Sequence, residues 1–530
     1  MNAAQIIENG KACLGIELGS TRIKAILIDS ENQNILASGN CNWENRLENG
    51  IWTYHEDEIK NSLQECYLDL KKDVLNKYNV VLKEFKALGI SAMMHGFLAL
   101  DKDDKLLCPF KTWRNTSARQ ASAKLTEELD YNIPERWSIA HLYDAMLKHE
   151  EYVPKIRFFT TLAGFIHYKL TGEKILGIGD ASGMFPINYK THDYHQNKVE
   201  LYNNLANKLG YEDFDLKRIL PKINLAGSNS GTLTNEGAKF LDPQGDLKSG
   251  CILCPPEGDA GTGMVATNTI KPRTGNVSVG TSIFAMLVLE NELKSFLREV
   301  DNVATPDGSP VAMIHANNCS SELNAQIGLF KEFAQKLNQK IDNDEIFKVL
   351  FQSAEMGEPD CGGVNIVPYF SGEFITNIEE GRPLIVRNQN AHYNLNNLMR
   401  AEINSAFCAL RIGFYTLAKS ENIVIDRLVG HGGLFKTKGI AQGIMSNALG
   451  APVEVMTTAG EGGAYGIAVL ASFSVNTQYS DLGDFLDNTI YKEKNTNIVN
   501  PTPELQKGFD NYLNMHKKCL EIEKRAVEVI

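Results

Sequence analysis

A duplicated hairpin pattern constrains the fold of this chain more than any other feature of its sequence. Apolar runs at Ala12 to Ile16 and at Ile23 to Ile28 flank a turn of small residues, Gly19 to Thr21. The same order of apolar run, Gly-Thr-Ser turn and apolar run returns at Asn276 to Leu289. Strand, tight turn and strand is the simplest assignment for each copy. One such hairpin in each half predicts two similarly built domains.

Length and composition agree with this prediction and exclude several classes of protein. The chain has 530 residues, and one hydrophobic core rarely supports more than about 300. Apolar residues make up 43% and charged residues 22%, which excludes a disordered chain. The net charge of −12, without a basic stripe, disfavours nucleic acid as a partner. Because neither Met1 to Gly10 nor any other segment reads as a signal peptide or membrane span, we expect a cytoplasmic protein without a membrane partner.

The ten cysteines include one close pair, Cys251 and Cys254. A structural zinc site would need a second pair, and Pro255 and Pro256 follow at once where a redox motif would open a helix. The pair is therefore interpreted as two thiols near the end of a strand.

Apolar runs and helical patterns alternate along the chain and predict an α/β fold. Besides the two hairpins, we expect strands at Ala87 to Ser91, Phe97 to Asp101, Asn365 to Val367 and Arg427 to Val429. Helical patterns occupy Glu56 to Tyr78, Ala118 to Leu129, Leu142 to His149, Asn324 to Leu337, Leu395 to Leu417 and Gly439 to Ala448. We expect a first domain at 1–267, a second at 268–477 and a tail at 478–530 whose helix packs on the second domain.

The turns of the two hairpins carry groups that bind phosphate. The first offers Gly19, Ser20, Thr21 and Arg22, which supply backbone N–H groups, two hydroxyls and a guanidinium, and the second offers Gly280 and Thr281. One such turn alone is most often structural, but two that face each other across a cleft would hold a nucleotide triphosphate. Neither the P-loop sequence nor the set of protein-kinase motifs is present, which excludes those two ways of binding ATP.

A carboxylate among small residues, Asp259, is the candidate catalytic base. It lies in the stretch Glu257 to Gly263, directly before a run that is compatible with a helix. A kinase that phosphorylates a hydroxyl benefits from a carboxylate that accepts the proton while Mg²⁺ and hydrogen-bond donors hold the phosphates. From the local sequence alone, Asp259 could equally be the N-cap of that helix.

Two glycine-rich segments in the second half are candidates for the nucleotide site. Gly432, Gly433 and Leu434 follow an apolar strand and offer a bare backbone against which a purine can lie. Gly460 to Gly466 then opens a helix of small residues that runs through Ala471. Such turns are also common structural devices.

With these segments in order, the chain resembles the FGGY family of carbohydrate kinases from about Ala12 to Ala471. The matching pieces are Gly15 to Thr21, Gly258 to Gly261, Ser278 to Ser282, Val367 to Glu373 and Gly432-Gly433. The resemblance implies two actin- and hexokinase-like (ribonuclease H-like) ATPase domains that flank a central catalytic cleft. It also implies ATP and Mg²⁺ as cofactors, a small-molecule sugar as substrate, a catalytic role for Asp259, and Mg²⁺ near Glu17 and Asp259. Because kinases of the family are often dimers, a homodimer is one option.

Within the family, Met94-His95-Gly96 and Trp113-Arg114-Asn115 most resemble the xylulokinase branch. The resemblance implies that Met94, His95, Trp113 and Asn115 line the sugar pocket with Asp259, and it favours a ketopentose such as xylulose or ribulose. A glycerol, polyol, other ketose or aldonate kinase of the same fold is the alternative, and an actin-like ATPase that switches a protein partner is an alternative from another class.

Three departures from the family pattern bear on these expectations. Glu17 stands where the family usually has Asp, which affects contact with Mg²⁺. Arg114-Asn115 replaces the usual Asn-Asp and removes one carboxylate from the sugar pocket. Asn317 to Ser321 stands where the family tends to have a helix start of small residues near the ribose of the nucleotide.

Overall fold

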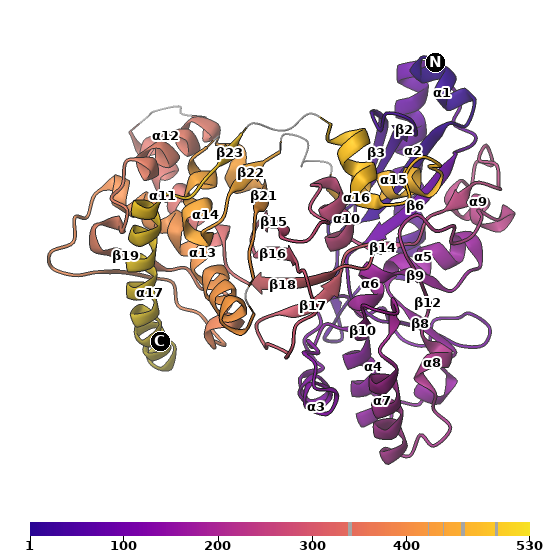
Figure 1. Cartoon of the computed structure of the whole chain (residues 1–530), viewed down its shortest axis with the longest axis horizontal. Helices are drawn as coiled ribbons and strands as arrows, with labels where there is room; N and C mark the ends of the chain where they lie inside the picture. Colours follow the sequence, from indigo (N-terminus) through magenta and orange to yellow (C-terminus); the bar gives the residue numbers. More distant parts are fainter. Residues whose placement is uncertain (338–341, 422, 438, 457–461, 493–496) are drawn as a thin grey trace.

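The computed structural model describes residues 1–337, 342–421, 423–437, 439–456, 462–492 and 497–530. Figure 1 shows two lobes, one formed by the indigo and magenta first half and the other mainly by the orange second half. Each lobe is built on a mixed sheet covered by helices. The predicted α/β class is confirmed.

The first sheet has the order β3-β2-β1-β6-β13, with β14 also paired to β6. Strands β1, β2 and β3 are antiparallel, whereas β6, β13 and β14 continue parallel to β1. The strands are β1 (Ala12–Leu18), β2 (Arg22–Asp29), β3 (Ile35–Asn42), β6 (Ala87–Ala92), β13 (Ile252–Leu253) and β14 (Glu257–Gly258).

The second sheet repeats this plan as β18-β16-β15-β21-β22, with β17 and β23 added at its edges. Strands β15 and β16 form the antiparallel hairpin, while β21 and β22 run parallel to β15. The strands are β15 (Thr274–Val279), β16 (Ile283–Val288), β17 (Asp301–Ala304), β18 (Pro310–Ala316), β21 (Arg427–Gly432), β22 (Val453–Val455) and β23 (Ile498–Val499). The two hairpins read from the sequence thus occupy equivalent places in two equivalent sheets.

The remaining elements cover the sheets and build the outer parts of the lobes. The helices of the first half are α1 (Ala3–Glu8), α2 (Glu56–Tyr78), α3 (Arg119–Leu129), α4 (Ser138–Leu147), α5 (Leu162–Thr171), α6 (Ile178–Ser182), α7 (Gln196–Lys208), α8 (Leu216–Ile219), α9 (Asn235–Leu241) and α10 (Asp259–Ala266). Those of the second half are α11 (Ser320–Lys336), α12 (Asn343–Glu355), α13 (Leu395–Ser420), α14 (Ile440–Leu449), α15 (Gly462–Ser474), α16 (Leu482–Phe485) and α17 (Pro503–Val529). Short strand pairs join β4 (Arg46–Glu48) to β5 (Ile51–Thr53), β7 (Leu98–Leu100) to β8 (Phe158–Thr160), β9 (Ile175–Gly177) to β12 (Lys222–Asn224), β10 (Ile187–Asn188) to β11 (Asp193–Tyr194), and β19 (Val364–Val367) to β20 (Leu384–Arg387).

Helix α15 packs on the first sheet although it comes late in the chain, and Figure 1 shows it in yellow beside the indigo strands. Gly15 of β1 and Gly89 of β6 are register partners and give it room. A Cβ atom on Gly15 would lie 2.3 Å from the Ala464 carbonyl oxygen, so no larger residue fits this contact. Helix α10 crosses α15 equally closely, since a Cβ on Gly466 would lie 2.0 Å from the Thr262 carbonyl oxygen. These crossing helices join the lobes.

The domain limits expected at 267 and 477 divide the chain by sequence order. In space, the first limit falls in the link from α10 to β15, while α15 and α16 lie with the first lobe. Helix α17 packs on the second lobe, where Phe509, Tyr512 and Leu513 join its core.

Candidate active site

The carboxyl ends of three parallel strands bring the predicted residues of the first lobe together. Leu18 of β1 and Gly258 of β14 both pair with Ala92 of β6. The segments that follow these strands are the Gly19 turn, the Met94-His95 loop and Asp259, so they meet at one edge of the sheet.

Asp259 is the first residue of α10, and the N-cap position belongs to Gly258, which sets aside the alternative that Asp259 is the cap. Its Oδ1 atom accepts hydrogen bonds from the backbone N–H groups of Met94 and Ala260, both at 3.0 Å. The side chain is exposed to solvent, yet desolvation by nearby protein atoms is the largest influence on its pKa, which is raised. The carboxylate is therefore reachable from solvent although protein atoms surround much of it.

Glu17 on β1 lies beside Asp259. Burial and the neighbouring carboxylate raise the pKa of Glu17 to about 7. Its Oε2 atom accepts a hydrogen bond from the Ala464 N–H at 3.3 Å. Two neighbouring carboxylates favour a divalent cation, and Mg²⁺ usually takes one or two protein carboxylates together with water and substrate phosphates. Within the part of the chain that the structure describes, no group of three or more His, Cys, Asp or Glu residues could hold a metal ion.

Aromatic residues hold the first turn in place. Trp43 donates from Nε1 to the Gly19 carbonyl oxygen at 2.7 Å, and the Tyr54 hydroxyl donates to the Ser20 carbonyl oxygen at 2.5 Å. Trp113, which is 37% exposed, donates from Nε1 to the Ser20 hydroxyl at 3.0 Å. The Gly19 N–H donates to the Arg22 carbonyl oxygen at 3.0 Å, so the groups that the turn can present to an anion are the N–H and hydroxyl groups of Ser20 and Thr21. Thr21 and Arg22 are exposed, and Arg22 donates from Nε to Asn42 at 3.0 Å.

His95 adopts a left-handed backbone conformation with φ of 70°, which is costly for a residue with a side chain and is common at functional sites. Burial lowers the pKa of His95 to about 3, so the ring is neutral. Its Nδ1 atom lies 3.0 Å from the Gly183 carbonyl oxygen and therefore carries the proton, which leaves Nε2 as an acceptor. The Met94 side chain lies against Gly183 and Gly258.

Asn115 lies in the same region but is committed to the protein backbone. Its Oδ1 atom accepts from the Trp52 N–H at 2.9 Å, and its Nδ2 atom donates to the carbonyl oxygens of Trp52 and Thr112. The side chain is buried. These contacts hold the loop that carries Trp113, and they occupy the groups with which Asn115 would bind a sugar.

Two further acids near Asp259 were given no role in the predicted site, although the segment Asp180-Ala181-Ser182-Gly183 resembles a family element near the substrate cleft. Asp180 is fully buried, accepts from the Thr161 hydroxyl at 2.6 Å and leaves its Oδ1 atom without a partner among the described residues. Burial and nearby Asp259 raise the pKa of Asp180 to about 7. Glu257 accepts from the Asp180 N–H at 2.9 Å. The position of Glu257 two residues before Asp259 was a signal in the sequence, whereas the approach of Asp180 requires the fold.

The second turn and the glycine pair meet at the matching edge of the second sheet. Val279 pairs with Gly432, whose φ of 115° and close approach to the Val279 carbonyl oxygen exclude a side chain. Gly280 and Thr281 are exposed, and their carbonyl oxygens accept from the N–H groups of residues 320 and 319. Gly433 is exposed with open space around it, and Leu434 is buried below. Gly460 lies outside the described residues, and the helix expected after it begins at Gly462.

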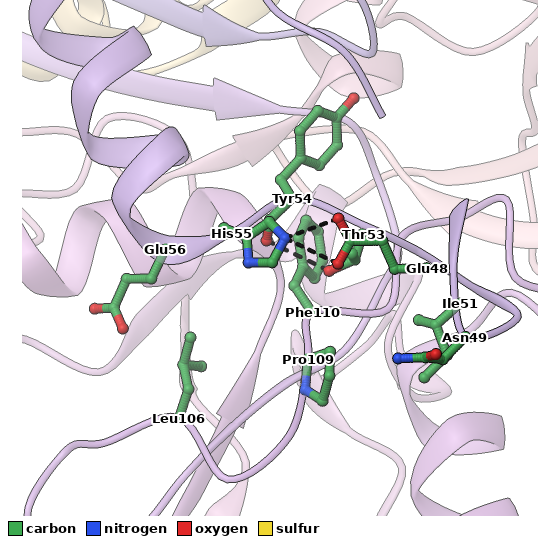
Figure 2. A pocket seen from close by; sticks show the side chains of 10 residues that line it. All are labelled: Glu48, Asn49, Ile51, Thr53, Tyr54, His55, Glu56, Leu106, Pro109 and Phe110. Carbon is green, nitrogen blue, oxygen red and sulfur yellow. Dashed lines mark hydrogen bonds and ion pairs between the residues drawn. The ribbon is translucent and has the colours of Figure 1, made fainter. Parts of the chain in front are cut away.

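A pocket of about 180 Å³ is lined by residues of the segments 48–56 and 106–110 and does not include Asp259. Figure 2 shows its lining, with His55 Nε2 at 3.0 Å from both carboxylate oxygens of Glu48. Tyr54 lines this pocket and also holds the Ser20 carbonyl oxygen, so the pocket adjoins the support of the turn. Within the described residues, no helix is both long and apolar enough to cross a membrane.

Comparison with known proteins covers both lobes. The model "FGGY family of carbohydrate kinases, N-terminal domain" matches residues 12–242, and the corresponding C-terminal domain matches residues 275–475. Xylulose kinase of Haemophilus influenzae is 24% identical over 427 residues, which are 76% of this chain and 78% of that protein. Ligand-bound xylulose kinase of Lactobacillus acidophilus superposes with a TM-score of 0.77 at 18% identity, covering 97% of this chain and 99% of that one. Gluconate kinase of the same organism also gives 0.77 at 18% identity, covering 96% and 98%.

Proposed function

The chain belongs to the FGGY family of carbohydrate kinases, and from this premise we propose that it transfers the γ-phosphoryl group of ATP to a hydroxyl of a ketopentose such as xylulose or ribulose. The observation that carries the proposal is the accessible Asp259 carboxylate, held by the Met94 N–H beside Glu17. The xylulokinase-like motifs at Met94-His95 and Trp113 favour the ketopentose, as do the relatives named as xylulose kinases.

Asp259 acts as the general base. Its Oδ1 atom is engaged with two N–H groups, and no other residue of the described chain donates to Oδ2. Oδ2 takes the proton of the attacking hydroxyl as the new O–P bond forms and the bond to the β-phosphate oxygen breaks, which releases ADP. The raised pKa of Asp259 brings its basicity closer to that of a general base at neutral pH.

Glu17 and Asp259 are the residues that would hold Mg²⁺. When bound, the ion offsets the charge of the phosphate oxygens. The first turn, through Ser20, Thr21 and Arg22, and the second turn, through Thr281, donate hydrogen bonds to the triphosphate. Gly19 and Gly280 shape these turns, since their N–H groups donate to the carbonyl oxygens of Arg22 and Ser282. Gly432, Gly433 and Leu434 receive the adenosine.

The acceptor sugar lies against the first lobe, near Met94, His95 and Trp113. The neutral His95 ring accepts from a sugar hydroxyl through Nε2, and Trp113 provides an apolar wall. Asn115 supports this wall through its bonds to Trp52 and Thr112. Closure of the lobes about α10 and α15 brings the hydroxyl and the γ-phosphate into line and excludes water.

An aldonate or polyol kinase is the second candidate. The structural relative named as a gluconate kinase superposes as well as the xylulose kinase does. This observation supports a sugar acid as the alternative acceptor. Membership in a carbohydrate kinase family disfavours the alternative of an actin-like ATPase switch.

A coupled ADP-release screen across ketopentoses, ketohexoses, polyols and aldonic acids tests the function. We expect ADP release that depends on a ketopentose and a matching sugar monophosphate signal in ³¹P NMR. Reactions without sugar are the control. ATP hydrolysis that ignores every sugar and yields no phosphorylated product would contradict the proposal.

A further inference from the structure

The second phosphate turn is held by the segment that follows strand β18. This strand ends beside the first residue of β16, which comes directly after the turn. The Cys319 N–H donates to the Thr281 carbonyl oxygen at 2.9 Å, and the next N–H along the chain donates to the Gly280 carbonyl oxygen at 3.3 Å. The conformation of the turn therefore depends on where residues 317–320 lie.

A buried carboxylate, Glu373, fixes the start of that segment. Its Oε2 atom accepts from the Asn317 N–H at 2.8 Å and from the Asn318 N–H at 3.4 Å. The Glu373 side chain is 1% exposed, so water does not compete for these bonds. Burial raises the pKa of Glu373 to about 7, although the N–H donors act against this rise. Above that pH the group is a carboxylate, to which N–H groups bond more strongly than to a neutral acceptor.

The Asn318 side chain completes the connection between the two segments. Its Oδ1 atom accepts from the N–H groups of Phe370 and Ser371 at 2.9 and 3.2 Å. Its Nδ2 atom donates to the Gly372 carbonyl oxygen at 2.5 Å, and the side chain is 3% exposed. Small residues at this helix start, which the family pattern favours, would form none of these side-chain bonds. Asn318 thus ties the start of α11 to residues 370–373.

The backbone that carries Glu373 is itself fixed by a tight hairpin. Glu373 and Ile378 exchange both of their backbone hydrogen bonds, at 2.6 and 3.1 Å. Gly372 has a φ of 72°, and a Cβ atom on it would lie 2.3 Å from the Glu379 carbonyl oxygen. The place of the Glu373 carboxylate is therefore set by the second lobe before any ligand binds.

We propose that Asn318 and Glu373 are positioning residues for the phosphoryl donor: by fixing residues 317–320, they hold the second turn in the shape that binds the phosphate groups of ATP. This inference rests on the proposed kinase function and deepens it. Because both side chains are buried, they act through the backbone and not by touching the nucleotide. Their loss weakens the binding of the phosphate groups and leaves the binding of adenosine unchanged.

The test measures the dissociation constants of ATP and of adenosine, without sugar and at about pH 8, for the wild type, Glu373→Gln and Asn318→Ala. We expect each variant to bind ATP about tenfold or more weakly, because bonds to a charged group or to buried N–H groups are lost. The affinity for adenosine should stay within about twofold. A change that only loosened the second lobe would weaken both ligands equally, and that result would overturn the inference.

Glu523→Gln is the matched control. Glu523 of α17 is also fully buried, and burial raises its pKa to about 7. Its Oε1 atom accepts from the Arg382 N–H at 3.0 Å, in the same connection between β19 and β20 that carries Glu373. Since Arg382 does not contact the second turn in the described chain, Glu523→Gln should keep ATP affinity within about twofold. An equal loss of ATP affinity in Glu523→Gln and Glu373→Gln would contradict the positioning role.

A double-mutant cycle shows whether the carboxylate acts through the turn. Thr281→Ala removes the hydroxyl of the turn, and we expect it to cost less than about twofold in ATP affinity when Glu373→Gln is already present. Losses that add in full would mean that Glu373 acts elsewhere, which would overturn the inference. A wild type that binds ATP but phosphorylates no sugar would contradict the proposed function alone, because none of these measurements needs a sugar.

Discussion

Two carboxylates that lie side by side in the first lobe, Glu17 and Asp259, give the site its electrostatic character. Each has a raised pKa, with desolvation as the main cause, and for Glu17 the charge of Asp259 adds to it. In the free protein, Glu17 is therefore partly protonated near neutral pH. Its proton must leave before a cation can bind, so metal binding and pH are linked at this residue.

We predict that the affinity for Mg²⁺-ATP falls as pH drops from about 8 to about 6, because Glu17, with a pKa of about 7, takes up a proton in this window. Glu17→Gln should lower the affinity for Mg²⁺ by about tenfold or more, and it should remove the change in affinity between pH 8 and pH 6. Glu17→Asp, which keeps the carboxylate, is the matched variant and should retain both. Isothermal titration at several pH values measures the effect, and a Gln variant with the wild-type Mg²⁺ response would exclude a metal role for Glu17.

At single residues, the sequence predicted chemistry better than contacts. Asp259 and the Glu17 position could be read from the residues around them, because small residues next to a carboxylate leave it open to a ligand. The role of Asn115 could not be predicted from its neighbours in the sequence, because its hydrogen bonds to Trp52 depend on how two loops meet. Asp180 was indicated only by the resemblance of Asp180-Ala181-Ser182-Gly183 to a family element near the substrate cleft. Its contact with Glu257 requires the fold, because the two residues are far apart in the sequence.

The adjacent glycines 432 and 433 show how one element combines a structural and a binding role. A Cβ on Gly432 would lie 2.0 Å from the Val279 carbonyl oxygen, whereas a Cβ on Gly433 would meet no atom within 4 Å. The first glycine therefore lets β21 pass close to the second turn. The second leaves a bare surface for a ligand.

We predict that Gly433→Ala raises the KM for ATP without lowering the melting temperature, because the added methyl group occupies only the space that we assign to adenosine. Gly432→Ala should lower the melting temperature by several degrees, through both the clash and its φ of 115°. Thermal melts and ATP kinetics on the pair separate the two roles. Equal ATP kinetics in wild type and Gly433→Ala would remove Gly433 from the nucleotide site.

Elements with a strong period were predictable, and those defined by pairing were not. Helix α2 was predicted with its observed bounds, Glu56–Tyr78, since its apolar stripe is regular. The β15–β16 hairpin was predicted to within two residues of its observed ends. Strands β13 and β14 have two residues each and exist only because β6 lies beside them. Strand β17, which carries Asp301, has no alternation and is defined by β18 and the first lobe.

Across the whole molecule, several buried ionisable groups make stability depend on pH. Desolvation is the largest cause that raises the pKa of Glu17, Asp180, Glu373 and Glu523 to about 7. These groups bind a proton more tightly in the folded than in the unfolded chain, so the stability they contribute is lost as pH rises through about 7. Burial lowers the pKa of His95 and His141 to about 3. These side chains make the folded state more stable as pH rises, but only at pH values near and below the usual histidine pKa of about 6.5.

We therefore predict that the melting temperature of the ligand-free protein falls as pH rises from about 7.5 to about 8.5, where the histidines are neutral in both states. Glu523→Gln, in the second lobe and away from the site, should reduce this slope because it removes one of the four groups. Calorimetry over this range checks the sign. A melting temperature that rises with pH in this window would contradict the raised pKa values.

The two sheets share one strand order, and helices α10 and α15 cross where they meet. Asp259 begins one of these helices, so the proposed base lies at the joint between the lobes. The repeated hairpin predicted this duplication, but the crossing of the helices depends on glycines whose contacts are not visible in the sequence.

The most direct test of this arrangement is the phosphoryl transfer rate of Asp259→Asn, measured together with its dissociation constant for ATP. If Asp259 is the base, transfer to the sugar falls by about a hundredfold or more while ATP affinity changes little. Asp103→Asn, at an exposed carboxylate, is the control and should match the wild type. An Asp259→Asn enzyme that phosphorylates its sugar at close to the wild-type rate would contradict the central claim.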